Sequence, residues 1–345
     1  MYAEEGITIA EDVVELLYPA GGSISFEQDI LGYCIVDAKG NIATKIVIGP
    51  AVEHTWSTDY VYNNEAHWHI CTDDDCFLAK YSSMYADVEG SAYGVHDTNG
   101  TDGVCSVCGY NTKKNVMVYV GNVGLANGEY LDNNGRISTV APSAGGYAYY
   151  KDSVLTLKDF VYKGEGHEYE ENSYIYSAAI YCELEELKLV LQGESQLTNT
   201  VGDGIYSTGD LSIEGAALLV NAEDDGFDVD GNLVVNSGTI SIITQDDDGI
   251  DVDEESTITM NGGELTIKAD DNGVDSAGDF VMNGGTLNIT SDADDCLDME
   301  GNITIHGGIV TLNADDDGLS AVDILIKGGT ITVEADEDGI YAYKD

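Results

Sequence analysis

The sequence predicts an all-β protein whose C-terminal half winds into a right-handed parallel β-helix. Turns related to Asp-Asp-Gly followed by an apolar residue recur seven times between residues 202 and 340, and successive copies are 21 to 24 residues apart. Between these turns apolar and polar residues alternate with a period of two, which is typical of half-buried strands. Each coil of about 22 residues should therefore contain three short strands, and parallel crossovers favour right-handed winding.

One repeat shows the expected elements in order. Residues 250–253, 257–260 and 264–267 alternate apolar and polar side chains, and Gly262-Gly263 separates the last two runs. Glycine adopts positive φ without strain, so this pair predicts a tight turn. The apolar residue after each turn should point inward and stack on its copies, as a column of Ile205, Phe227, Ile250, Val274, Leu297, Leu319 and Ile340.

The chain divides into four segments by composition. Residues 199–345 carry the Asp-rich repeats, and residues 113–198 should form degenerate first coils, because strand-like runs persist there without the Asp-Gly turns. Residues 51–112 contain four of the six histidines and four of the seven cysteines, which indicates a small metal-binding module of the zinc-knuckle type. Residues 1–50 predict a small β segment of unknown role, with strand-like runs at 30–36 and 45–48.

The net charge excludes several classes of partner. The chain has 64 acidic and 13 basic side chains, a formal charge of −51, and residues 201–345 hold 34 of the acidic but only three of the basic ones. Such a surface repels nucleic acid and anionic membranes, and a compact fold at this charge density calls for bound cations. No apolar run is long enough to insert into a membrane, and the first residues lack the features of a signal peptide.

The outward acidic residues should form columns along the predicted helix. Calcium binds six to eight oxygens at about 2.3–2.6 Å and would relieve the repulsion between stacked carboxylates. The alternative is a solvated acidic face, but the regular register and the scarcity of basic partners favour several calcium ions. The expected ligands are Asp225, Asp228, Asp230, Asp248, Asp251, Asp253, Asp271, Asp275, Asp295, Asp298 and Asp317.

The cysteine pairs at 71/76 and 105/108 predict structural zinc, because Cys-x2-Cys and similar spacings are typical of zinc sites. Disulfides are the alternative if the chain is secreted, although a Cys-x2-Cys disulfide closes a small, strained loop. One zinc ion is expected, or two if nearby histidines replace a ligand or build a second site. The first-choice ligands are Cys71, Cys76, Cys105 and Cys108, and the additional candidates are His54, His69 and His96.

Two stretches resemble known families. Asp-Asp-Gly-Ile-Asp-Val-Asp at 247–253 and Met-Asn-Gly-Gly at 260–263 and 282–285 resemble secreted carbohydrate-binding β-helix proteins of clostridia and related anaerobes, over roughly 175–345. This resemblance implies a pectate-lyase-like solenoid that binds calcium and associates with cellulose or pectin-like glycans, outside or on the surface of an anaerobic Gram-positive bacterium. The Cys/His pattern, with Gly-Val-Cys-Ser-Val-Cys-Gly-Tyr at 103–110, is similar to a repeat on surface proteins of gut Firmicutes.

Three functions compete. An extracellular, calcium-dependent protein that binds plant-type polysaccharides is favoured, and a calcium-stiffened adhesin or filament subunit that stacks on copies of itself is the alternative. A polysaccharide lyase is disfavoured and no enzyme activity is expected, because the catalytic base would be Lys or Arg and only Lys268 lies near the Asp turns. Candidate sugar-stacking residues, each of which could equally be an ordinary strand residue, are Tyr147, Tyr149, Tyr150, Tyr174 and Tyr176.

Overall fold

The computed structural model describes residues 2–3, 15–18, 23–27, 32–36, 47–49, 55–63, 65–72, 90–97, 104–110, 116–171, 173–253 and 256–343. Every regular element in these ranges is a β-strand, which confirms the all-β prediction. The same residues contain no helix that could cross a membrane. The chain divides into two compact units: residues 1–113 with 134–136, and residues 114–133 with 137–345.

The first unit consists of short antiparallel pairings. A three-stranded sheet has the order β1 (Tyr2–Ala3), β4 (Gly32–Val36), β3 (Ser23–Glu27). A separate pair is formed by β2 (Glu15–Tyr18) and β5 (Val47–Gly49). The Cys/His segment contains β6 (Trp56–Tyr62), β7 (Ala66–Cys71) and β8 (Gly94–Val95). Asn63 closes the β6–β7 hairpin, because its side-chain oxygen accepts hydrogen bonds from the backbone N–H groups of Glu65 and Ala66, both at 2.8 Å.

The second unit begins with antiparallel strands, and the degenerate coils expected over residues 113–198 occur only in the later part of that segment. These strands are β9 (Val118–Val120), β10 (Val123–Leu125), β11 (Glu129–Asp132), β12 (Ile137–Ser138) and β13 (Tyr147–Lys151), followed by β14 (Val154–Lys158). Asp152 and Ser153, which join β13 to β14, have φ of 51° and 60°. Two successive positive φ angles are the geometry of a tight hairpin turn, which reverses the chain instead of carrying it into a coil.

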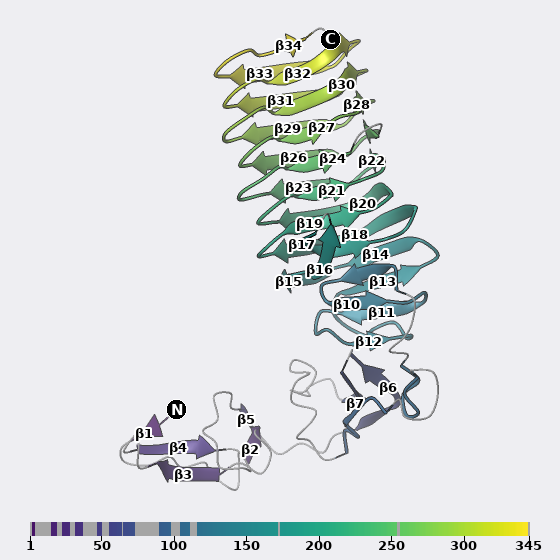
Figure 1. The fold of residues 1–345 in the computed structure, drawn as a ribbon. Coiled ribbons are helices and arrows are strands. Elements are labelled where there is room, and N and C mark those ends of the chain that lie inside the picture. Colours follow the sequence, from purple (N-terminus) through teal and green to yellow (C-terminus); the bar gives the residue numbers. More distant parts are fainter. Residues whose placement is uncertain are drawn as a thin grey trace. The chain divides into compact units, whose positions relative to one another are not determined.

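Parallel stacking begins where β14 and β15 (Val161–Gly164) pair with β18 (Glu186–Asn199). From there each coil supplies three strand positions, and equivalent positions of successive coils pair in parallel (Figure 1). The parallel β-helix with three strand positions per coil is therefore confirmed. The first position is occupied by β19 (Asp203–Ser207), β21 (Phe227–Val229), β24 (Ile250–Val252), β27 (Val274–Ser276) and β34 (Tyr341–Ala342).

The other two positions follow the same rule. The second is occupied by β22 (Leu233–Val235), β25 (Thr257–Met260) and β28 (Asp279–Met282). The third is occupied by β23 (Thr239–Ile243), β26 (Glu264–Ala269), β29 (Thr286–Ser291), β31 (Ile309–Ala314) and β33 (Thr330–Ala335). Longer strands continue through a corner and cover two positions each: β18, β20 (Asp210–Asn221), β30 (Leu297–Ile305) and β32 (Leu319–Ile326).

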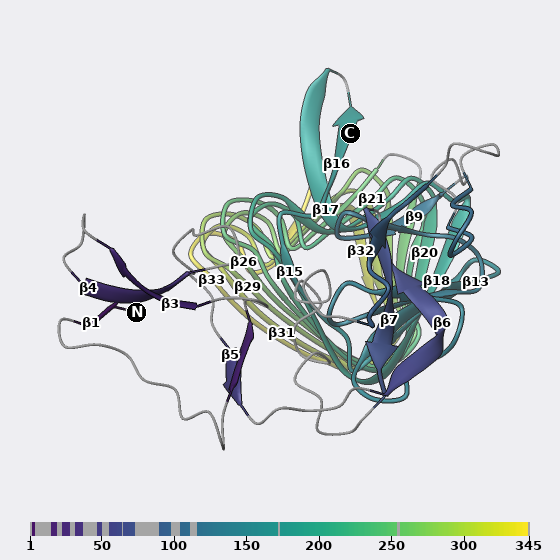
Figure 2. The same cartoon turned by 90° about the horizontal axis from the view of Figure 1, so that it is seen from below.

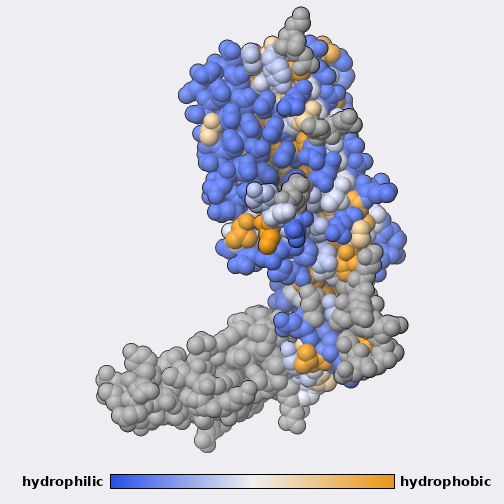
Figure 3. All heavy atoms as spheres, in the orientation of Figure 1, coloured by the Kyte–Doolittle hydropathy of each residue, from blue (hydrophilic) through white to orange (hydrophobic). Residues whose placement is uncertain are grey.

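The predicted inward column forms the core. Ile205 pairs with Phe227 and Phe227 with Ile250, and the column from Ile205 to Leu319 is at most 1% exposed at every member. Ile340 differs, since it is 49% exposed and no described coil lies beyond it. Burial of this apolar column favours stacking by about 25 cal/mol per Å². The outer surface of the coils is largely hydrophilic on the face shown in Figure 3.

One hairpin departs from the coil outline. β16 (His167–Glu171) pairs antiparallel with the first half of β17 (Tyr174–Cys182), while the second half of β17 joins the stack beside β19. Seen along the stack, this hairpin extends well beyond the coils (Figure 2). Its end carries exposed apolar side chains, because Tyr174 is 68% and Ile175 75% exposed.

Candidate functional site

The outward Asp column expected on the first strand position is present as a set of register partners. Asp228 pairs with Asp251, Asp251 with Asp275, and Asp275 with Asp298. These four side chains are half-buried. Tyr206 precedes Asp228 in the same column. Four carboxylates therefore lie one above another, with a tyrosine next in line.

The second column lies two residues further along each coil. The backbone N–H of Asp230 donates to the carbonyl of Ser207 at 2.9 Å, and that of Asp253 to the carbonyl of Val229 at 3.2 Å. Both backbones are thus held by the preceding coil. The side chain of Asp253 is exposed and that of Asp230 is half-buried. This column lies nearer to solvent than the first.

The turn column has a structural role that the sequence did not suggest. The carboxylate of Asp225 accepts a hydrogen bond from the backbone N–H of Asp248 at 3.0 Å, and the carboxylate of Asp248 accepts one from Asn272 at 2.8 Å. Asp295 and Asp317 each accept the same bond from the following coil, at 2.6 and 2.7 Å. One oxygen of each turn side chain therefore joins neighbouring coils, which leaves the other oxygen for a further ligand.

Two groups of carboxylates converge closely enough to share a cation. One oxygen from each of Asp225, Asp247 and Asp248 lies within 4.8 Å of the others. The same holds for a second group formed by Asp294, Asp295 and Asp316. Two oxygens on opposite sides of a calcium ion would be about 4.8 Å apart, since each calcium–oxygen bond is about 2.4 Å. Each group therefore offers three of the six to eight oxygens that a calcium ion binds.

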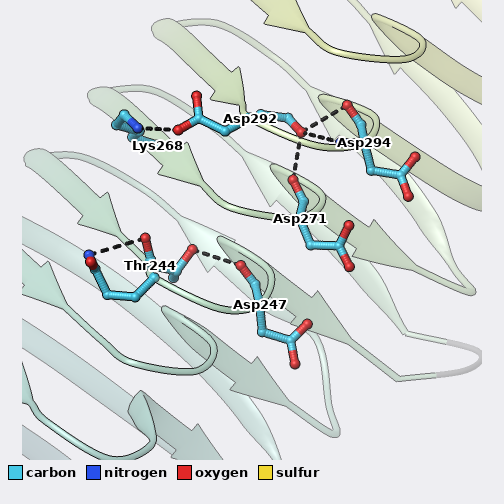
Figure 4. A network of polar contacts seen from close by, with 8 residues as sticks. Thr244, Asp247, Lys268, Asp271, Asp292 and Asp294 are labelled. Atoms are coloured by element: carbon cyan, nitrogen blue, oxygen red, sulfur yellow. Dashed lines mark hydrogen bonds and ion pairs between the residues drawn. The ribbon is translucent and has the colours of Figure 1, made fainter.

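Asp247, Asp294 and Asp316 were not among the predicted ligands. Each stands two residues before the turn Gly or Cys, whereas the predictions used mainly the Asp directly before it. The repeated pairing was the pattern that could have revealed them. The carboxylates of Asp247, Asp271 and Asp294 point toward the same side of the coils (Figure 4). Asp271 was predicted and shares this direction, but it belongs to neither group.

Burial and mutual repulsion perturb these carboxylates. Burial, followed by neighbouring acidic groups, raises the pKa of Asp225 to about 10 and that of Asp248 to about 8. For Asp295 burial again dominates and raises the pKa to about 7. Burial and the adjacent carboxylates raise the pKa of Asp251 and of Asp275 to about 6. These sites favour either protons or a divalent cation over bare negative charge.

The one candidate base for lyase chemistry is already engaged. The ammonium of Lys268 forms an ion pair with the carboxylate of Asp292. This pair lies on the side away from the direction in which the turn carboxylates point (Figure 4). A lysine held by this carboxylate, away from the Asp turns, is not placed to take a proton from a substrate bound beside them.

An aromatic cluster lies at the start of the Asp columns. The ring of Tyr206 stacks on that of Tyr169 at 4.4 Å between centroids. The hydroxyl of Tyr169 donates to the carboxylate of Asp203 at 2.9 Å, and that of Tyr206 to Asp230 at 3.2 Å. Tyr169 belongs to the projecting hairpin. The hydroxyls therefore connect the hairpin and the first full coil to the acidic residues.

The five predicted tyrosines lie on two strands that do not pair with each other. Tyr174 and Tyr176 lie on β17, where Tyr176 stacks on Tyr169 at 5.7 Å between centroids. Tyr147 and Tyr149 lie on β13 and pack against Tyr130, at 5.2 and 4.0 Å. Tyr150 is also on β13 and is half-buried, and burial raises its pKa. Tyr169 and Tyr206 were missed, although Tyr206 occupies the repeat position of Asp228.

In the N-terminal unit, two histidines and two cysteines meet. Ligand atoms of His67, His96, Cys105 and Cys108 all lie within 4.8 Å of one another. The sulfur of Cys105 is 3.7 Å from Nδ1 of His67, and the sulfur of Cys108 is 3.5 Å from Nδ1 of His96. Burial opposes ionisation of Cys105, but backbone N–H groups of Cys108 and Val107 face its sulfur and lower its pKa to about 6.

This group differs from the predicted ligand set. Cys105, Cys108 and His96 were predicted, whereas His67 was not. Cys71 is buried at the end of β7 and lies outside the group, and His69 stacks on Tyr60 at 4.0 Å. Cys76 and His54 lie outside the described residues. His67 and Cys71 are four residues apart on one strand, and spacing alone did not separate them.

The second unit is thus a parallel β-solenoid with acidic columns and an aromatic cluster. The chain belongs to the family of carbohydrate-binding domain-containing proteins, whose family model matches residues 160–339, more than half of its length. The match covers most of the stack of coils and the projecting hairpin, and it does not include the Cys/His group. No curated protein and no solved structure matches the chain.

Proposed function

We propose that this protein binds plant-type polysaccharides outside the cell and that calcium supports the binding. The observation that carries the proposal is the junction of the Asp columns with the tyrosine cluster, inside the segment that matches the carbohydrate-binding family. Aromatic faces pack against the apolar faces of sugar rings, while polar groups at their edges bind hydroxyls. In this protein the aromatic rings and the polar carboxylates occur within two coils.

The calcium part of the proposal rests on the two carboxylate groups. Asp225, Asp247 and Asp248 would hold one ion, and Asp294, Asp295 and Asp316 another. Bound calcium supplies positive charge and can accept further oxygen ligands, including those of an acidic glycan. The raised pKa of Asp225, to about 10, supports the need for a counter-charge there.

The projecting hairpin is the proposed contact surface for the glycan. Tyr174 is 68% and Tyr176 40% exposed, so their rings are open to a ligand. Tyr169 holds the hairpin against the stack by its ring contact with Tyr206 and its bond to Asp203. A ligand on these rings would lie beside the beginning of the Asp columns.

A glycan array with millimolar calcium, repeated in chelator, tests the proposal. We expect binding to cellulose or to pectin-like glycans, and only the acidic glycans should lose affinity strongly in chelator. A Tyr174→Ala/Tyr176→Ala variant should bind at least about tenfold more weakly, because each stacked ring contributes on the order of 1 kcal/mol. Leu325→Ala, at a residue that is 49% exposed elsewhere on the stack, is the matched control.

Sedimentation of the same samples separates the remaining possibilities. A glycan-binding monomer should sediment at the same rate with and without calcium. Absence of binding to every glycan in calcium would contradict the proposal. Calcium-dependent polymers without glycan binding would favour the adhesin or filament subunit instead.

A further inference from the structure

The Cys/His group has the dimensions of a tetrahedral metal site. With metal–sulfur bonds of about 2.3 Å and metal–nitrogen bonds of about 2.0–2.1 Å, tetrahedral geometry requires sulfur–nitrogen separations of about 3.6 Å. The two observed separations are 3.7 Å for Cys105 with His67 and 3.5 Å for Cys108 with His96. Neither Cys105 nor Cys108 forms a disulfide with a described residue. These two edges match a bound zinc ion, and the ligand atoms of all four side chains lie within 4.8 Å of one another.

The surrounding residues fix the orientation of one histidine. The Nε2 atom of His96 is 2.8 Å from the backbone carbonyl of Asn63, where it can donate its proton. This contact leaves Nδ1, on the opposite side of the ring, without a proton and directed at Cys108. Tyr110 stacks on the His96 ring at 4.4 Å. Both contacts hold the ring in the orientation that a metal ligand needs.

Gly94 makes room for the other histidine. It pairs with His67 across the β7–β8 ladder. A Cβ atom at residue 94 would lie 3.0 Å from Nε2 of the His67 ring and 3.3 Å from its Cε1 atom. A larger residue at position 94 would therefore press on the imidazole from the side of Nε2.

The two cysteines lie in a tight turn that suits a metal knuckle. The backbone N–H of Gly109 donates to the carbonyl of Cys105 at 3.0 Å, and Gly109 has a φ of 77°, which glycine adopts without strain. The N–H groups of Val107 and Cys108 face the sulfur of Cys105. Such N–H groups stabilise a thiolate ligand.

We propose that His67, His96, Cys105 and Cys108 bind one structural zinc ion. Four protein ligands fill the tetrahedron and leave no open position, which is the arrangement of structural rather than catalytic zinc. The site joins β7 to the segment that follows β8 and to the 105–108 turn. The strands that carry these residues, β7 and β8, are short. A small β unit of this kind has little core of its own and gains much of its stability from a bound metal.

Metal analysis of the full-length protein tests the site. The protein is purified with a reducing agent, loaded with zinc, and washed with millimolar calcium to remove zinc from the carboxylates. We expect about one zinc per chain, as one closed four-ligand site requires. His67→Ala and Cys105→Ser should each reduce the zinc content to near zero. Cys71→Ser should retain it, which distinguishes this ligand set from one that includes Cys71 and Cys76.

Cobalt substitution of the unmutated protein provides a readout that does not depend on how a variant folds. Cobalt in the site should give the visible bands of tetrahedral coordination and a sulfur-to-cobalt charge-transfer band with the intensity of two thiolates. Zinc-free protein after loading, or a spectrum without thiolate bands, would overturn the proposal. So would four-thiolate intensity, a Cys105–Cys108 disulfide in the native protein, or loss of zinc in Cys71→Ser with retention in His67→Ala.

Discussion

In one coil, Cys296 and Leu312 occupy two positions at which the neighbouring coils have a glycine and a β-branched residue. A Cβ atom on Gly273 would lie 2.1 Å from the Cγ2 methyl of Ile289, and the same clash appears at Gly226 with Ile242. Leu312 is the register partner of Ile289 in the next coil. Leucine is not branched at Cβ, so Leu312 lacks the Cγ2 methyl that Ile289 has. Cys296 is fully buried. The cysteine side chain is therefore accommodated by a change sixteen residues later.

The first prediction follows from this exchange. Leu312→Ile should destabilise the protein by about 1–3 kcal/mol, because the new Cγ2 methyl meets the Cβ of Cys296. The Cys296→Gly/Leu312→Ile double variant should recover most of that loss, and a double-mutant cycle measured by denaturant unfolding gives the coupling. Leu287→Ile, at a buried site of the preceding coil, is the control. Additive effects of the two substitutions would contradict this account.

The second prediction concerns pH. In chelator, the melting temperature should fall between pH 5 and pH 8. The pKa is about 8 for Asp248 and about 6 for Asp251 and Asp275 in the folded chain, against about 3.9 when unfolded. The folded state thus holds these protons more tightly, and the stability they contribute is complete below about pH 4 and lost as pH rises through the folded values. Saturating calcium should flatten this dependence.

A melting temperature in chelator that stays constant or rises from pH 5 to pH 8 would show that these carboxylates are not perturbed. Differential scanning calorimetry with buffers of matched ionic strength gives the measurement. Ionic strength must be matched because the chain carries a formal charge of −51, and salt screens repulsion between exposed charges.

The third prediction is that calcium raises the melting temperature by about 10 °C or more. Each site contributes about 2.7 kcal/mol at a hundredfold excess over its Kd, and each kcal/mol shifts melting by roughly 2–4 °C in a unit of this size. Asp247→Asn with Asp294→Asn should abolish most of the shift, since each substitution removes a charge from one carboxylate group. Asp246→Asn with Asp270→Asn removes the same charge from exposed neighbours and should have little effect. Equal melting in chelator and in calcium would leave only a solvated acidic face.

The fourth prediction uses the one amide in the turn column. Asn272 accepts the hydrogen bond from the Asp295 backbone at 3.1 Å through its side-chain oxygen, which Asp can replace. Asn272→Asp should therefore keep the coil contact but add a charge between Asp248 and Asp295. We expect a lower melting temperature in chelator and a larger gain on adding calcium, both measured by thermal unfolding. A lower melting temperature under both conditions, with no larger calcium gain, would contradict cation binding at this column.

The fifth prediction is that the protein does not cleave polygalacturonate. Lys268 is paired with Asp292 and lies on the side away from the direction in which the turn carboxylates point. No ultraviolet-absorbing unsaturated product should accumulate, with or without calcium. Product formation that Lys268→Ala abolishes would contradict this prediction and establish a lyase.

The repeat made the solenoid predictable, because a period of 21 to 24 residues and the alternation within it fix which side chains face inward. The column from Asp228 to Asp298 follows directly from that register. The antiparallel strands at the start of the second unit could not be predicted in this way. The reversal of the chain depends on positive φ at Asp152 and Ser153, and neither residue type by itself indicates a positive φ. The contact of Tyr169 with Asp203 could not be predicted either, because Tyr169 lies on a hairpin outside the repeat and Asp203 lies in one of the repeated coils.

The sequence indicated that cysteines and histidines would cluster in this segment, but not which of them would meet. Residues 67, 69 and 71 alternate on one strand, and the choice of His67 over Cys71 depends on where the chain returns after β8. After β8 the chain places His96 and the 105–108 turn next to His67, whose strand partner is Gly94. Sequence spacing contains no information on that return.

The five hydrogen bonds along the turn column all run in one direction, from the backbone of a later coil to the side chain of an earlier one. During synthesis the earlier coil leaves the ribosome first. It therefore already presents the acceptor when the next coil emerges, and the new backbone N–H can bind as soon as it arrives. Because solenoids propagate structure from neighbour to neighbour, each finished coil acts as a template, and the chain can be folded in the order in which it is made.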